Sequence, residues 1–269
     1  MLRVLIHEDR CDPRYNLAID ESLLITHYLG ITKGSTLRIW RNLNSVVLGY
    51  FSRLEDEVNI RYLRRLNPIV VRRFTGGGSV YHDLGNLNYT IVTELPSNSR
   101  PIDYIYKYLL KGLINVLKEL SLNVEVVNLS DVLVNDRKVS GNAGTFKNNY
   151  ALLHGTLLIS TDASLINELF KVPWDRVRKY GIDPRKYRVT NLRRVLGRYV
   201  SEYLIRELII KNYSSLLRDT YVITNRLSSE ESEIANILYN LKYSRDSWNL
   251  SRVYDRGLIS ELIRCTYRR

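Results

Sequence analysis

The stretch RRFTGGGSVYHDLGNLN, residues 72–88, is the most informative part of this chain. An apolar run, Ile69 to Val71, leads into two arginines and three consecutive glycines, and apolar alternation resumes at Val80. The pattern predicts a strand, a glycine loop and a second strand. Adjacent glycines cost backbone entropy, so compact domains usually keep them where φ is positive or a ligand comes close. Because guanidinium groups match phosphate and carboxylate geometry, the arginines indicate an anionic ligand. A tight hairpin with surface arginines is the alternative.

A second informative segment covers residues 130–156. Its apolar and turn residues predict a strand, an Asn-Asp turn, a strand that carries Lys138, a second turn and a third strand. The small residues at 140–143 would leave room for the Lys138 ammonium group to reach a bound ligand. Lysine is rarely buried, so an ordinary solvated strand lysine is the competing interpretation. The segment therefore predicts a β-meander with one candidate catalytic lysine.

Together, the two segments resemble the lipoate-protein ligase A family, within the wider biotin and lipoate protein ligase group. Three ordered motifs carry the resemblance: RRxxGGGxVYHDxGNxN at 72–88, DRKVSGNA at 136–143 and HGTLL at 154–158. Weaker matches lie at 12–21, 37–42, 179–182 and 188–192. The resemblance implies an α/β (α+β) fold of mixed, largely antiparallel sheets flanked by helices, that is, a class II synthetase or biotin-lipoate ligase-like catalytic domain.

The resemblance also implies a two-step reaction. Lipoate would attack the α-phosphate of ATP to give lipoyl-adenylate, and a lysine of an acceptor protein would then attack the activated carbonyl. ATP, Mg²⁺ and the substrate lipoate are the implied ligands. Lys138 matches the family's catalytic lysine, a fixed cation aimed where negative charge develops. The implied ATP-binding residues are Arg73, Gly78, Ser79, Val80, Tyr81, Asp131 and Lys138, and the implied lipoate-binding residues are Arg72, Gly77, His82, Lys138, Gly141, Asn142, Ala143, His154 and Gly155.

Several polar residues in these motifs also have ordinary structural interpretations. We assign His82 to positioning rather than proton transfer, because a strand histidine is commonly a hydrogen-bonded structural residue. Asp83, Asn86 and Asn88 are equally compatible with turn formation at residues 84–85.

Asp131 is the carboxylate of the second motif that we consider for magnesium or nucleotide binding, with a turn role as the alternative. The chain departs from the family pattern in two places. Gly49 is followed by Tyr50, Phe51 and Ser52 where the family usually has a glutamine, and Ser130 precedes Asp131 where the family has an asparagine.

Length and composition fit one catalytic domain with a short addition. The chain has 269 residues, 45% of them hydrophobic, which is enough to bury a substantial core. We predict a catalytic domain over residues 1–246 and a short C-terminal extension over 247–269, in place of the accessory domain that bacterial family members commonly carry. The sequence contains no apolar run of about 18 residues and no signal-like N-terminus, so we expect neither export nor membrane insertion. Cys11 and Cys265 are far apart in sequence, which argues against a disulfide scaffold and favours a cytoplasmic location.

Charge is unevenly distributed along the chain. Residues 1–170 carry 19 basic and 17 acidic side chains, a net of +2, whereas residues 171–269 carry 21 and 11, a net of +10. We interpret this basic third as a surface that steers an acidic acceptor, with a solvated basic face as the alternative. The resemblance implies acceptor lipoyl domains of 2-oxoacid dehydrogenase complexes or the glycine cleavage H protein, and a small accessory ligase subunit in trans. We expect no membrane and no nucleic-acid partner.

Capping and periodicity predict four helices. The first begins at Pro13 with Asp12 as N-cap, and others cover residues 100–120, 201–217 and 230–241, the last opened by Ser228.

Three rival functions remain. An octanoyl or lipoyl transferase of the same fold would carry the acyl group on a cysteine thiolate, yet both cysteines lie outside the motifs. A biotin ligase would have a different glycine-arginine loop. A basic nucleic-acid-binding protein would bind DNA or RNA with steep salt dependence.

Overall fold

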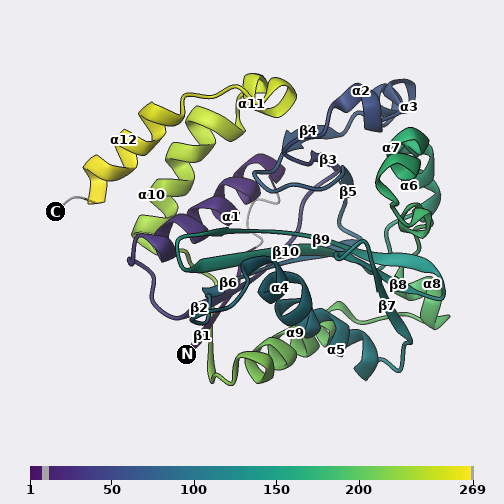
Figure 1. The fold of residues 1–269 in the computed structure, drawn as a ribbon, viewed down its shortest axis with the longest axis horizontal. Helices are drawn as coiled ribbons and strands as arrows, with labels where there is room; N and C mark the ends of the chain where they lie inside the picture. Colours follow the sequence, from purple (N-terminus) through teal and green to yellow (C-terminus); the bar gives the residue numbers. More distant parts are fainter. Residues whose placement is uncertain (8–11, 268–269) are drawn as a thin grey trace.

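A long mixed sheet with helices on both faces forms the body of the protein (Figure 1). The computed structural model describes residues 1–7 and 12–267. In sheet order the eight strands are β11 (Tyr221–Thr224), β1 (Leu2–Ile6), β2 (Ser35–Trp40), β6 (Asn86–Glu94), β10 (Tyr150–Leu158), β9 (Arg137–Lys147), β8 (Asp131–Val134) and β7 (Val124–Val127). β1 pairs in parallel with both neighbours, and the other neighbours pair antiparallel. The prediction of a mixed, largely antiparallel sheet is confirmed, as is the β-meander formed by β8, β9 and β10.

A smaller three-stranded sheet carries the glycine loop. Its strands, in order, are β4 (Ile69–Arg72), β3 (Ser45–Leu48) and β5 (Val80–His82). β3 pairs in parallel with β4 and antiparallel with β5, so the loop over residues 73–79 crosses from one edge of this sheet to the other. The predicted order of strand, glycine loop and strand is confirmed. Between β3 and β4 lie the short helices α2 (Leu54–Glu57) and α3 (Ile60–Leu66).

Two helices, α1 (Pro13–Tyr28) and α10 (Ser229–Leu238), cover one face of the large sheet (Figure 1). The Asp12 side chain accepts a hydrogen bond from a first-turn N–H of α1, as an N-cap residue does. Ser228 and Glu231 form a capping box at the start of α10. Both helix starts agree with the predictions, because capping depends on residues only a few positions apart.

The opposite face is covered by residues 101–119 and by α9 (Glu202–Leu217) (Figure 1). A continuous helix was predicted over 100–120, but its middle turn is a π-helix, η1 (Tyr104–Leu109). Gly144 of β9 lies against this turn, and a Cβ there would be 2.5 Å from Cγ2 of Ile105. The bare glycine backbone thus makes room for the wider turn. The flanking helices are α4 (Pro101–Asp103) and α5 (Lys111–Glu119).

The C-terminal segment packs on the rest of the chain. It forms α11 (Asp246–Ser251) and α12 (Arg256–Tyr267). Trp248 is fully buried, in one hydrophobic cluster with Leu17 of α1 and Val71 of β4. Residues 247–267 therefore share a core with the catalytic part, and a domain boundary at residue 246 stays a prediction.

Two core layers flank the large sheet. Leu113 of α5 and Tyr213 of α9 belong to the layer on one face, and Leu23 of α1 and Ala235 of α10 belong to the layer on the other. Within the part of the chain that the structure describes, no helix is both long and apolar enough to cross a membrane. The remaining helices are α6 (Ala163–Leu169), α7 (Trp174–Tyr180), η2 (Pro184–Tyr187), α8 (Leu192–Leu196) and η3 (Tyr239–Tyr243).

Candidate active site

A row of five residues crosses the large sheet and lines a cavity. Trp40 of β2 lies opposite Asn88 of β6, and Asn88 lies opposite Thr156 of β10. Thr156 lies opposite Gly141 of β9, and Gly141 lies opposite Asp131 of β8. Directly opposed residues of antiparallel strands share one face of the sheet. All five line the same cavity, which therefore runs across the strands.

The cavity has an apolar end and a charged end. It encloses about 610 Å³, a size typical of ligand sites. Leu17, Trp40 and Val47 line the apolar end. The cavity as a whole is lined by five cationic and two anionic side chains, a net charge of +3. These are Arg73, Lys138, Lys171, Arg176 and Lys186 against Glu57 and Asp131. A ligand with an apolar part and an anionic part fits this arrangement.

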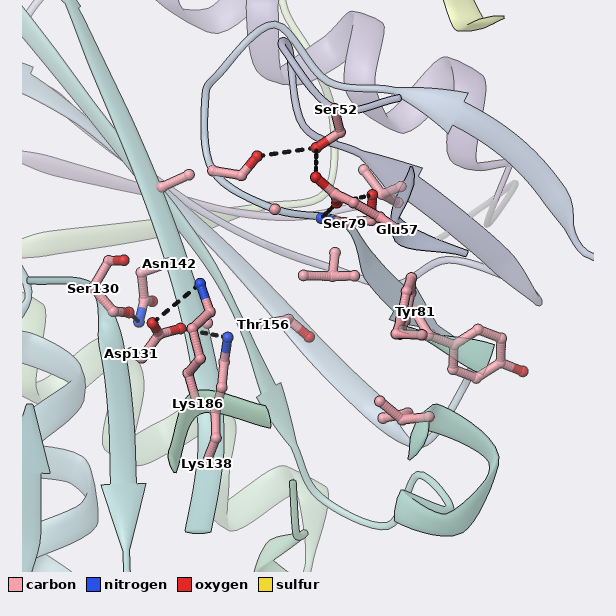
Figure 2. Close-up of a pocket in the computed structure, with 18 of the residues that line it drawn as sticks. Ser52, Glu57, Ser79, Tyr81, Ser130, Asp131, Lys138, Asn142, Thr156 and Lys186 are labelled. Carbon is pink, nitrogen blue, oxygen red and sulfur yellow. Dashed lines mark hydrogen bonds and ion pairs between the residues drawn. The ribbon is translucent and has the colours of Figure 1, made fainter. Parts of the chain in front are cut away.

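Two lysines meet one carboxylate at the charged end (Figure 2). The Lys138 ammonium forms an ion pair with Asp131, and the Lys186 Nζ lies 3.7 Å from the second Asp131 oxygen. Burial raises the pKa of Asp131, but the attraction of Lys138 and Lys186 outweighs it and leaves the pKa below its usual value. Burial lowers the pKa of Lys186, opposed by the attraction of Asp131. One carboxylate against two ammonium groups leaves this end positive.

Backbone pairing positions Lys138. Its N–H donates to the Arg188 carbonyl oxygen at 2.7 Å, and its own carbonyl oxygen accepts from the Thr190 N–H at 2.9 Å. These bonds tie the start of β9 to the segment after η2. A Cβ on Gly141 would lie 2.8 Å from the Lys138 Nζ, so the absence of a side chain at Gly141 gives the ammonium its space. The expectation that small residues leave Lys138 room is confirmed.

Arg73 holds the glycine loop in place. Its Nη2 donates to the carbonyl oxygens of Gly76 at 2.6 Å and Gly78 at 2.8 Å. Burial lowers the pKa of Arg73 to about 10, so the guanidinium stays charged at neutral pH. Gly77 has φ +91°, a conformation that L side chains rarely adopt. The triple glycine thus shapes one wall of the cavity.

Lys138, Asp131 and Lys186 form the Lys138 cluster, and Glu57 faces it from the wall that carries the glycine loop (Figure 2). Its carboxylate accepts from the Ser79 N–H and the Ser79 hydroxyl, both at 2.7 Å, and from the Ser52 hydroxyl at 2.8 Å. Arg176 of α7 also donates to it, at 3.2 Å. The backbone N–H of Ser79, one of the implied ATP-binding residues, therefore already binds a carboxylate.

Arg72 does not reach the cavity, which corrects its predicted role in lipoate binding. Its guanidinium donates to the carbonyl oxygens of Gly49, Tyr50, Ser52, Trp248, Asn249 and Leu250. Successive residues of a strand point to opposite faces. Arg73 therefore points to the glycine loop, while Arg72 is buried against α11.

The two motif histidines line the cavity in fixed orientations. Asp20 and Thr75 hold the His154 ring, with Nδ1 2.9 Å from an Asp20 oxygen and Nε2 2.7 Å from the Thr75 hydroxyl. Asn42 donates to Nδ1 of His82 at 3.0 Å. Burial lowers the pKa of His82 to about 3, so its ring is neutral at neutral pH. These contacts support the assignment of His82 to positioning.

Apart from Arg72, the predicted site residues all line the cavity, and their individual roles stay predictions. Asp83 forms the expected turn, since its side chain accepts from the Gly85 N–H at 2.8 Å. Asn88, considered for the same turn, lies within β6 instead. Several lining residues were not predicted as site residues, among them Trp40, Glu57, Arg176 and Lys186. Trp40 lies inside a weak family match, and Lys186 lies just before another.

The site at Asp131 that was predicted for magnesium does not fit a metal ion. Asp131 is already paired with Lys138 and Lys186, and two ammonium groups repel a divalent cation. Residues 1–7 and 12–267 contain no group of three or more His, Cys, Asp or Glu side chains that could hold a metal ion. We therefore derive no step through a metal held at Asp131.

The cavity lies in a segment that matches a known family. The model of the lipoyl protein ligase A/B catalytic domain matches residues 12–214, which include the whole row across the sheet, the glycine loop and Lys138. The chain belongs to this family. The match to the family model thus confirms the resemblance that rested on the three motifs.

Curated relatives in the family include ligases and a transferase. Lipoate-protein ligase A subunit 1 of Thermoplasma acidophilum is 28% identical over 92% of this chain and 96% of its own length. Lipoate–protein ligase 1 of Staphylococcus aureus is 29% identical over 93% of this chain and 74% of its own length. Octanoyltransferase LipM of Brevibacillus brevis is 26% identical over 89% of this chain and 95% of its own length.

Solved structures of family members have the same fold. The bipartite lipoate protein ligase of T. acidophilum, described with its E2 lipoyl domain, has a TM-score of 0.80 at 28% identity, covering 95% of this chain and 98% of its own. A putative lipoate protein ligase from T. acidophilum with bound lipoic acid has a TM-score of 0.78 at 27% identity, covering 92% and 98%. A lipoate-protein ligase A bound with ATP has a TM-score of 0.79 at 28% identity, covering 93% and 99%.

Proposed function

We propose that this protein is the catalytic subunit of a lipoate-protein ligase, which activates lipoate with ATP and transfers the lipoyl group to a lysine of an acceptor lipoyl domain. The observation that carries the proposal is the cavity that joins an apolar end at Trp40 to a net positive end at Lys138. An acyl chain fits the first and the carboxylate and phosphates fit the second. Relatives described with lipoic acid and with ATP support both substrates.

In the first step, a lipoate carboxylate oxygen attacks the α-phosphorus of ATP and pyrophosphate leaves. Both partners are anionic, so the step depends on positioning and on neutralising charge. Lys138 donates to the reacting oxygens, and its partner Asp131 is shared with Lys186, which leaves positive charge available. Arg73 and the loop from Gly78 to Tyr81 line the cavity, and we expect them to bind the nucleotide phosphates once Glu57 releases the Ser79 N–H.

In the second step, the uncharged amine of the acceptor lysine attacks the acyl carbon. The bond from that carbon to the phosphate oxygen breaks, AMP leaves, and the amine loses a proton. Negative charge develops on the acyl oxygen and on the leaving phosphate. Lys138 lies at the charged end of the cavity, where one ammonium group can stabilise both.

Partners follow from the same proposal. The acceptor is a lipoyl domain of a 2-oxoacid dehydrogenase complex or the glycine cleavage H protein, reached from the basic C-terminal third. A small accessory subunit in trans completes adenylation. The similarity to a relative named as a ligase subunit and to a ligase described as bipartite supports this. Because the reaction consumes ATP, we place it in the cytoplasm.

Exchange of labelled pyrophosphate into ATP tests the proposal. We expect exchange with lipoate and none with biotin, and a large increase when the accessory subunit of a bipartite ligase is added. No exchange with any acid in the presence of that subunit would contradict the ligase function. Full lipoylation by the purified chain alone, at about one turnover per second or faster, would contradict the need for a subunit.

Acyl transfer through a cysteine thioester is the second candidate, because one relative is an octanoyltransferase. Cys265 is exposed on α12 and does not line the cavity, and Cys11 lies outside the described residues. We expect Cys11→Ser and Cys265→Ser to retain lipoylation, since an adenylate route needs no thiolate. A stable acyl-thioester on either cysteine, with activity lost on its removal, would favour the transferase.

A further inference from the structure

Asn88 carries a buried carboxamide that no described residue satisfies. The residue is 1% exposed, and it lines the cavity opposite Trp40. Neither its amide nitrogen nor its carbonyl oxygen has a hydrogen-bond partner within residues 1–7 and 12–267. A carboxamide offers two donors and an acceptor, and leaving them unpaired in the interior costs folding free energy. A buried polar group needs a partner, and in the wall of a cavity a bound ligand can supply it.

A second asparagine on the same face of β6 provides a contrast. Asn86 is also buried, and its amide donates to the Tyr81 carbonyl oxygen and to the Thr156 hydroxyl, both at 3.0 Å. Its own carbonyl oxygen accepts from the Asp83 N–H at 3.2 Å and from the Thr161 hydroxyl at 2.5 Å. Asn86 is therefore a structural residue whose hydrogen bonds are made within the protein. Two positions further along the strand, the carboxamide of Asn88 makes no hydrogen bond within the described residues and is free to bind a ligand.

The register of the sheet gives the distance from Asn88 to the charged end. Asn88 and Gly141 belong to the row across the sheet and are separated by one intervening strand, β10. Neighbouring strands lie about 4.8 Å apart, so the two residues are about 10 Å apart. Gly141 lies beside the Lys138 ammonium. An extended chain of eight carbons spans roughly 9 Å, so an acyl group with its carboxyl end at Lys138 ends near Asn88.

We propose that Asn88 selects acyl chains with a hydrogen-bond acceptor at the far end, and so favours the dithiolane ring of lipoate over the methyl end of octanoate. The inference rests on the proposed function and adds its specificity. Divalent sulfur is polarisable and a weak acceptor, so it can accept from the amide N–H. A methyl group leaves the carboxamide unpaired, and sites built this way reject analogues that lack the polar group.

Binding of three acids to the purified chain, measured by titration calorimetry, tests the proposal. The acids are lipoate, octanoate and cyclopentylpentanoic acid, which keeps the ring and replaces both sulfurs by methylene groups. We expect wild type to bind lipoate about tenfold more tightly than the cyclopentyl acid, the equivalent of one hydrogen bond. In Asn88→Leu, which keeps the side-chain shape, we expect this difference to disappear. Equal affinities in wild type, or a difference that persists in the variant, would overturn the selectivity.

Thermal unfolding without ligand supplies the matched control. Asn88→Leu removes an unpaired carboxamide, so its melting temperature should rise, whereas Asn86→Leu removes four hydrogen bonds and should melt lower. If Asn88→Leu melts as low as Asn86→Leu, or fails to fold, Asn88 is a structural residue and the proposal is wrong. If no acid binds wild type, the proposed function fails as well. Equal binding of all three acids leaves that function standing and overturns only the role of Asn88.

Discussion

Two lysines of this protein are paired with a carboxylate in opposite surroundings. Lys242 is 1% exposed, and its ammonium contacts both oxygens of Glu21, at 2.7 and 2.9 Å. Three aromatic rings surround it, with centroids 5.1 Å away at Tyr243, 4.2 Å at Trp248 and 4.6 Å at Tyr254. This cluster joins α1 to the C-terminal segment and is closed by side chains.

The Lys138 cluster opens onto the cavity instead. Asp131 is shared with Lys186, so one positive charge is left over, whereas Lys242 and Glu21 balance. The comparison teaches that burial and pairing alone do not make a lysine functional. Excess positive charge that faces a cavity is what marks Lys138 as a candidate functional residue.

The largest expected difference is in catalysis. Lys138→Ala should reduce lipoate adenylation by at least about a hundredfold, because a preorganised donor to developing charge is worth that much. The fold should persist, since Asp131 keeps Lys186 as a partner. Pyrophosphate exchange and thermal unfolding measure the two effects, with Lys147→Ala, at the exposed end of the same strand, as the control. A folded Lys138→Ala protein with normal exchange would remove the lysine from the mechanism.

Lys242→Ala should have the converse effect, on stability. It leaves Glu21 without its countercharge and opens space between the rings, at a cost of about 3 kcal/mol in the free energy of unfolding. Exchange activity should stay within a few-fold at a temperature where the protein is folded. Urea unfolding measures the loss, and the double change Lys242→Met with Glu21→Gln should recover most of it. A loss below about 0.5 kcal/mol, typical of surface substitutions, would contradict the structural role.

Acid should lower the stability of the protein through two buried histidines, His82 and His27. Burial lowers the pKa of His82, in the cavity, to about 3, and that of His27, on α1 outside it, to about 4. The unfolded chain, with histidine pKa near 6.5, binds more protons below that pH, so stability falls as pH drops from about 6.5 toward 4. Each histidine should cost about 2 kcal/mol at pH 5. Urea unfolding of wild type and His27→Gln at pH 7 and pH 5 checks this; the same pH dependence in both proteins would exclude His27 as a source.

The sequence predicted those features that depend on neighbouring residues. The N-cap at Asp12, the capping box at Ser228 and the meander around Lys138 each follow from residues a few positions apart. Most of the predicted site residues that line the cavity fall in three compact motifs.

The features that it did not predict depend on contacts between distant segments. Arg72 looked like a ligand residue because it adjoins Arg73, yet its partners on α11 lie more than 170 positions away. Lys186 joins the site through Asp131, from a segment after α7. Asn88 resembled a turn residue, and only the register of β6 against β2 and β10 places it in the cavity.

Transfer of the lipoyl group to an acceptor domain is the most direct test of the account. Purified wild type, Lys138→Ala and Lys147→Ala are incubated with lipoyl-adenylate and an acceptor lipoyl domain, and the modified lysine is quantified by mass spectrometry against a reaction without protein. The account predicts that wild type and Lys147→Ala modify one acceptor lysine without any accessory subunit, and that Lys138→Ala is slower by about a hundredfold or more. Transfer by wild type no faster than the reaction without protein, or equally fast transfer by Lys138→Ala, would contradict it.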